Sequence, residues 1–285
     1  MRCVRELPPW LTGLLVASAL ALLARPAHAD DQPFVTIYTT DIQTTRGREI
    51  EQWLSWRTNH GNERFNEFLS RTELEYGITD YLQGSLYLNY DFEQARAHNP
   101  LGPVETTNSF GVSGEAILRL LNPYFDPLGF ALYFEPTWSA KERSLETKLL
   151  LQKNFFNDTL RTAVNVNFED QWVENALGHY DQQSALEFDL GASYNVTPDF
   201  SVGLEFDNEH GFDDLILGGP ARETSNSFFL GPTIYYVAHP WSIWLAAQAQ
   251  LPIATNPTGT PGAVVSGQTV DAEHFRTTLK FAMDF

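Results

Sequence analysis

The sequence predicts an all-β protein, an antiparallel transmembrane β-barrel of about twelve strands, with ten or fourteen strands as alternatives. Three observations lead to this fold. About twelve segments alternate apolar and polar side chains with a period of two. Beyond the N-terminal region no run of about 18 apolar residues occurs, which argues against membrane-spanning helices. Tight turns alternate with long loops, typical of a barrel with short periplasmic turns and longer extracellular loops.

The N-terminal region has the pattern of an export signal. Arg2 and Arg5 precede an apolar run over 10–23, and Ala27-His28-Ala29 forms an A-x-A cleavage site. We therefore predict a cleaved signal peptide over 1–29, a periplasmic N-terminal segment over 30–47 and an outer-membrane β-barrel over 48–285. The middle segment leaves two alternatives open, because the alternation over 34–45 suits either an extra periplasmic strand or an extended tail that enters the barrel.

Composition narrows the chemistry. Without residues 1–29 the chain has 15 basic and 35 acidic residues, a formal charge of −20, which disfavours nucleic acid as a partner. The single cysteine, Cys3, lies in the predicted signal peptide, so disulfides and thiolate sites are not expected.

The alternating segments follow one another at short intervals. They are residues 48–58, 64–78, 82–95, 108–121, 130–140, 144–155, 161–173, 182–195, 200–208, 227–237, 241–252 and 272–285. Pro136 and Pro232 interrupt two of them, and each removes a backbone donor from its strand. The long connections are predicted at 96–107, 209–226 and 256–268.

One face of these segments is apolar and the other is charged. Charged side chains fit a hydrated lumen better than a dry core. The candidate lumen-lining residues are Glu73, Glu75, Asp91, Glu115, Arg119, Glu187, Asp189, Glu205, Arg276 and Lys280.

The last segment carries a second signal. Phe281, Met283 and the terminal Phe285 share its apolar face, and this ending resembles the C-terminal recognition signal of Gram-negative outer-membrane barrels. It predicts that the last strand closes the barrel and binds the barrel-assembly machinery. The expected location is the bacterial outer membrane, with membrane lipid and lipopolysaccharide as neighbours.

Three functions are compatible with this pattern. Twelve strands lie between filled eight-stranded barrels and open channels, and the acidic lumen favours a narrow channel or an uptake protein for small solutes or ions. The alternatives are an occluded barrel with a structural or surface-binding role and, less favoured, a lipid-modifying enzyme. No histidine lies in a nucleophile motif, so no catalytic, cofactor-binding or metal-binding residue is predicted, and no cofactor is expected.

Three stretches carry a family resemblance: EQWLSWR over 51–57, RTELEYGITDYLQ over 71–83 and YLNY over 87–90, together with Phe285. With them the chain resembles a family of uncharacterised proteobacterial porin-like outer-membrane β-barrels. The resemblance implies a transport-associated barrel without an assigned substrate. A looser likeness to barrels of aromatic-compound degradation implies uptake of small hydrophobic or aromatic solutes.

Overall fold

The computed structural model describes residues 32–285 apart from 61–62, 97–103, 176, 214–221, 254–263, 266–267 and 270–271. The predicted signal peptide therefore lies outside the described residues. The strands are β1 Arg48–His60, β2 Glu63–Thr79, β3 Leu82–Arg96, β4 Glu105–Leu121, β5 Gly129–Ser139, β6 Glu142–Phe155, β7 Leu160–Glu174, β8 Tyr180–Thr197, β9 Phe200–Asp213, β10 Arg222–Ala238, β11 Trp241–Gln250, β12 Val264–Val265, β13 Gln268–Thr269 and β14 Glu273–Asp284.

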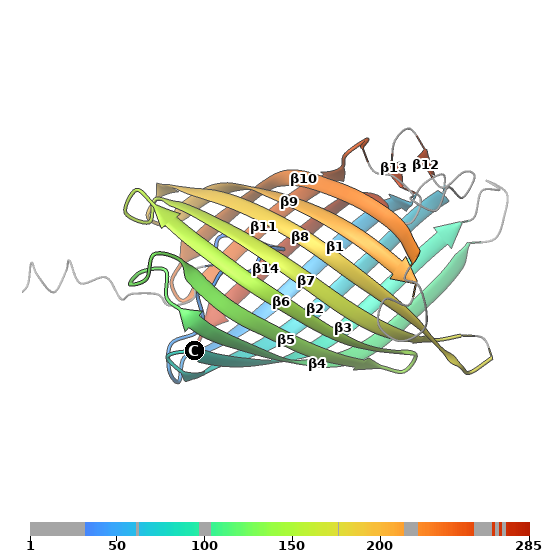
Figure 1. The fold of residues 1–285 in the computed structure, drawn as a ribbon, viewed down its shortest axis with the longest axis horizontal. Helices are drawn as coiled ribbons and strands as arrows, with labels where there is room; N and C mark the ends of the chain where they lie inside the picture. Colours follow the sequence, from blue (N-terminus) through green and yellow to red (C-terminus); the bar gives the residue numbers. More distant parts are fainter. Residues whose placement is uncertain are drawn as a thin grey trace, which may run out of the picture.

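Twelve of these strands form one closed antiparallel barrel, which confirms the predicted fold class (Figure 1). Neighbours in sequence pair with each other, and β14 closes the barrel between β1 and β11. The short strands β12 and β13 form a separate hairpin. Within the described residues, none forms a helix long and apolar enough to cross a membrane.

The two ends of the barrel differ in their connections. The turn end carries residues 80–81, 122–128, 156–159, 198–199 and 239–240, and the C-terminus lies there as well (Figure 1). The opposite end, called the loop end, carries the connections 97–104, 214–221 and 251–272, but also the two-residue connections 61–62 and 140–141. The alternation of short turns and long loops is therefore less strict than the sequence suggested.

The predicted loop 209–226 is wrong at both ends. β9 continues to Asp213 and β10 begins at Arg222, and these two residues are paired in the ladder. Cross-strand polar contacts support the extension, since Asn208 Nδ2 donates to Asn226 Oδ1 at 2.9 Å. The ladder continues here without the alternation that lipid imposes on the membrane-spanning part.

Side chains alternate between the outer surface and the lumen along each wall strand. On β8, Phe188 and Leu190 are exposed and Asp189 between them is buried. On β1, the exposed Ile50 lies between the buried Glu49 and Glu51. The apolar face thus meets lipid and the charged face meets the interior, as the period of two requires.

Both prolines lie inside wall strands beside local gaps in the ladder. The pairing of β4 with β5 skips Pro136, and the pairing of β10 with β11 skips Pro232. Because proline has no N–H to donate, the gap falls where a hydrogen bond is missing anyway. Each proline keeps its other neighbour, with Pro136 opposite Leu145 and Pro232 opposite Leu204.

At Gly231, next to Pro232, the backbone of β11 leaves no room for a side chain. A Cβ atom at Gly231 would lie 1.9 Å from the carbonyl oxygen of Ala247, and a backbone atom cannot rotate away. We expect Gly231→Ala to lower the free energy of unfolding by about 1–3 kcal/mol, the usual cost of overpacking. Urea unfolding of the refolded barrel measures it. Gly114→Ala is the matched control, because its nearest neighbour would lie at 3.9 Å, and equal stability of both variants would contradict the prediction.

Candidate functional site

The N-terminal segment runs inside the barrel as coil. We call residues 32–43 the inner segment. They form no strand, and all but Thr36 are buried. Of the two alternatives left by the sequence, the structure has the tail that enters the barrel. Within the predicted N-terminal segment 30–47, residues 32–43 lie inside the barrel.

Apolar side chains of the inner segment pack on three parts of the wall. Tyr38 and Ile42 pack in one cluster with Ile117, Ala131, Tyr133 and Leu150. Val35 packs with Tyr235, Trp244, Ala246 and Ala282, and Phe34 and Ile37 pack with Ala163. This wall face therefore carries apolar patches among its charges, and the inner segment covers them.

Polar wall side chains satisfy the backbone of the inner segment. Glu205 accepts hydrogen bonds from the amides of Val35, at 2.8 Å, and of Thr36, at 2.9 Å. Asn165 clamps Tyr38, since its Oδ1 accepts from the Tyr38 amide and its Nδ2 donates to the Tyr38 carbonyl, both at 2.8 Å.

Two glutamines continue this pattern toward the point where the segment joins β1. Gln152 Oε1 accepts from the Thr40 amide at 2.8 Å, and Gln83 Oε1 accepts from the Gln43 amide at 2.7 Å. A chain without strand partners buries its amides only where such acceptors exist. The wall is therefore built to receive this segment in one position.

On the loop-end side of the inner segment, the lumen holds a cavity of about 540 Å³. Its lining runs from Thr36 and Tyr38 to Ser139 and Glu142, which flank the loop-end connection 140–141. Among the described residues, ten carboxylates and four cationic side chains line it. The carboxylates are Glu67, Asp91, Glu135, Glu142, Glu146, Glu169, Glu187, Asp189, Asp207 and Glu209, and the cations are Arg57, Arg71, Lys148 and Arg276.

Carboxylates and aromatic rings hold the cationic side chains. Arg71 pairs with Glu135 at 2.7 Å and lies 4.1 Å from the centroid of the Tyr87 ring. Lys148 pairs with Glu146 at 2.9 Å and contacts the Tyr38 ring. These contacts hold the cationic side chains against the wall. The carboxylates that line the cavity outnumber the cationic side chains and therefore favour a negative potential in it.

Tyr38 forms part of the cavity floor. Burial raises the pKa of its phenol well above the usual value, and the nearby Glu115 and Glu73 carboxylates raise it further. The floor is therefore a neutral hydroxyl, and it adds no negative charge to the cavity.

The predicted lumen residues fall into four groups. Asp91, Glu187, Asp189 and Arg276 line the cavity. Glu73, Glu75, Glu115 and Lys280 are buried on the wall but are not part of the cavity lining, and Glu205 binds the inner segment. Arg119 is half-buried at the turn end, where it donates to the Asp80 carbonyl at 2.6 Å.

The C-terminal residues lie on the outer face. Phe281, Met283 and Phe285 are exposed, and β14 pairs with β1 at the closing seam. Binding of the assembly machinery by these residues stays a prediction.

Sequence reasoning missed the residues that receive the inner segment. The sequence pattern shows only that Gln152 and Gln83 lie at inward-facing positions of their strands. It gives no sign that the Trp244 indole donates to the Gln32 carbonyl at 2.6 Å. The alternation with a period of two shows which side chains face inward, but it does not show which of them contacts the inner segment.

A family model described as a family of unknown function, DUF6662, matches residues 26–285. The chain belongs to the DUF6662 family. No curated protein sequence matches it. The family assignment agrees with the general resemblance found in the sequence, an uncharacterised barrel family, and carries no substrate.

Solved structures with a fold similar to that of this DUF6662 chain are outer-membrane barrels. It is similar to the COG4313 outer membrane channel from Pseudomonas putida F1, with a TM-score of 0.58, 12% identity and coverage of 92% of this chain and 100% of that one. The translocator domain of the autotransporter NalP from Neisseria meningitidis gives 0.54 and 9%, covering 96% and 98%. The NanC porin gives 0.50 and 9%, covering 83% and 100%. At these identities the likeness shows the fold alone.

Proposed function

We propose that this protein is an outer-membrane channel for small cationic or neutral polar solutes, which enter from the loop end and pass when the inner segment moves. The loop end is then extracellular and the turn end periplasmic. The observation that carries the proposal is the cavity of about 540 Å³, whose ten carboxylates outnumber its four cationic side chains. Low-dielectric walls concentrate the field of such a charge excess, which attracts cations and repels anions.

The cavity also bears on the solute. Of its thirty described lining residues, fourteen are charged, so a hydrophobic or aromatic solute would have to displace water from carboxylates without replacing their hydrogen bonds. Uptake of such solutes, which the looser sequence resemblance implied, is therefore disfavoured. The likeness in fold to an outer membrane channel and to a porin supports transport as the general function.

Single-channel recording tests the proposal. The chain from residue 30 is refolded in detergent, inserted in a planar bilayer and held under a salt gradient, so that the reversal potential gives the ion preference. Brief openings with cation preference are expected. Steady silence from a barrel shown to be folded by its heat-modifiable migration would support instead the occluded barrel with a structural or surface-binding role.

Glu187 provides the charge test of the cavity. It lines the cavity beside Asp189, and Asn167 Nδ2 donates to both carboxylates. Glu187→Gln keeps the shape and removes one ionisable carboxyl group, so in recordings at alkaline pH we expect the reversal potential to shift toward zero. Glu105→Gln is the control, since Glu105 is exposed outside the cavity. Equal reversal potentials in Glu187→Gln and the parent chain would show that ions do not pass this wall.

A further inference from the structure

Four glutamates crowd the inward face of β1 and β2 near the turn end. In the register of these strands Glu49 lies opposite Glu75, and Glu51 lies opposite Glu73. All four side chains are buried. Like charges directly opposite each other destabilise a sheet, and buried charges are costly unless they are compensated. The cluster therefore calls for positive charge.

The protein supplies part of that charge. Lys280 Nζ from β14 lies 2.5 Å from Glu51 Oε1, and Trp53 Nε1 donates to Glu51 Oε2 at 2.8 Å. Gln43 of the inner segment donates to Glu49 at 3.3 Å. In these contacts a single ammonium group faces a cluster of four carboxylates.

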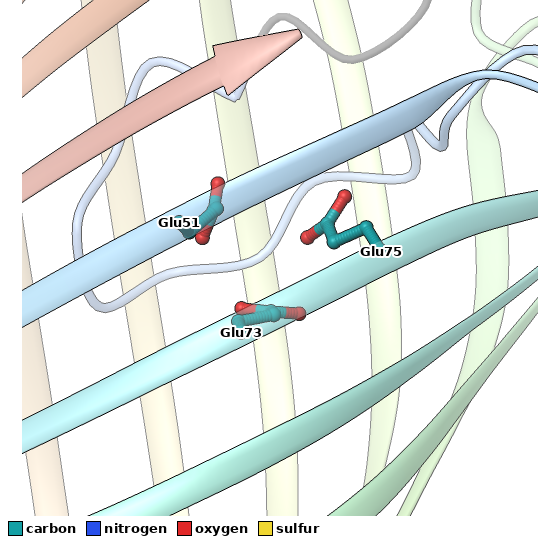
Figure 2. A group of neighbouring side chains, drawn as sticks. All are labelled: Glu51, Glu73 and Glu75. Carbon is teal, nitrogen blue, oxygen red and sulfur yellow. The ribbon is translucent and has the colours of Figure 1, made fainter. Parts of the chain in front are cut away.

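Glu73 has a carboxylate oxygen that lacks a hydrogen-bond donor within the described part of the chain. Its side chain is only 2% exposed, and among the described residues its Oε1 has no hydrogen-bond partner. A buried carboxylate oxygen without a donor is unusual, because it has lost water and gained nothing in return. Figure 2 shows Glu51 on β1 and its neighbours Glu73 and Glu75 on β2, whose carboxylates lie close together.

The geometry of the three carboxylates suits a hard cation. Glu51, Glu73 and Glu75 each offer one oxygen, and these oxygens all lie within 4.8 Å of one another. Calcium accepts carboxylate oxygens in flexible, irregular geometry, whereas magnesium demands near-ideal octahedral geometry and usually keeps several of its waters. An all-oxygen donor set also disfavours zinc, which prefers nitrogen and sulfur ligands.

We propose that Glu51, Glu73 and Glu75 bind one calcium ion in the lumen wall. The ion would link β1 to β2 at a place where Lys280 already links β1 to β14. It would also lie next to Glu49, which holds Gln43 at the end of the inner segment. The site is separate from the cavity, whose lining includes none of these glutamates, and it stands whether or not the barrel conducts.

Terbium luminescence tests the site, because Tb³⁺ replaces Ca²⁺ at oxygen ligands and Trp53 is in hydrogen-bond contact with Glu51. The refolded barrel is titrated with Tb³⁺ at neutral pH under tryptophan excitation. Saturable emission that excess Ca²⁺ removes is expected, together with a higher unfolding temperature in Ca²⁺ than in chelator. Glu73→Gln should weaken the binding by about tenfold or more, since it removes one ligand charge.

Glu115→Gln is the matched control. Glu115 is a buried lumen glutamate outside the three, and its carboxylate accepts from Ser85 and Tyr87. This variant should keep the emission and the calcium response. Emission that survives unchanged in Glu73→Gln would assign Tb³⁺ to the cavity acids and overturn the proposal. Absence of any calcium-competed emission in the parent chain would overturn it directly, even if Glu73→Gln did not fold.

Discussion

A chain that lacks residues 33–43 is expected to conduct ions at several times the single-channel conductance of the full chain. These residues occupy the lumen between the cavity and the turn end, and their apolar side chains pack on the wall. The wall is closed by β14 pairing with β1, so it does not need them to form a barrel. Recordings in planar bilayers measure the change, and heat-modifiable migration confirms that the shortened chain is folded.

A reversible lock separates motion of the inner segment from its mere presence. A Cβ atom at Gly129 would lie 2.2 Å from Thr40 Oγ1, so cysteines at these two positions are close enough to be joined. We expect Thr40→Cys/Gly129→Cys to be silent when oxidised and to conduct when reduced. Each single cysteine variant is the control. Equal conductance of the oxidised and reduced forms, with cross-linking shown by loss of free thiols, would refute gating by this segment.

Arg276→Met is expected to lower the free energy of unfolding by about 3–5 kcal/mol, the cost of removing one partner of a buried ion pair. The Arg276 guanidinium pairs with Asp207, and with Glu209 at 2.5 Å. It also donates to Gln248 at 2.6 Å and lies 4.1 Å from the centroid of the Phe229 ring. Methionine fills much of the space but leaves the Asp207 carboxylate buried without its cation. Urea unfolding in detergent micelles gives the free energy.

Two companion variants identify the cause. Arg276→Lys keeps the charge but loses the forked geometry, so it should cost less than methionine. Asp207→Asn added to Arg276→Met removes the stranded charge and should restore part of the loss. A double variant no more stable than Arg276→Met alone would show that packing, rather than charge, sets the effect.

The wall of the barrel was predictable because lipid and water act on alternate residues. The predicted segment 144–155 and the observed β6, Glu142–Phe155, differ only at one end. Errors arose where lipid no longer imposes the alternation, as at residues 209–213 and 222–226. There, polar side chains lie on both faces, and the strands continue because their backbones still pair.

The interior was harder to predict, because its contacts have no period. Val35 meets Glu205 across 170 residues of chain and Tyr38 meets Asn165 across 127. In each case one wall side chain binds the backbone of the inner segment, and no spacing in the sequence signals the pair. The glutamate cluster was predictable only in part. The i, i+2 spacing of Glu49 with Glu51, and of Glu73 with Glu75, places each pair on one face of its strand. Only the strand register shows that the two pairs face each other.

The inner segment is synthesised before the wall strands, yet its partners lie on β3, β6, β7 and β9. Glu205 has no fixed place until β9 is paired, so Val35 has no acceptor while the wall is still growing. Contacts between such distant parts of the chain carry a high entropic cost and form late. A half-assembled wall therefore has a wet interior, with the apolar patches around Tyr133 and Trp244 uncovered. The inner segment thus gains its full set of backbone acceptors only after β9 has paired with β8.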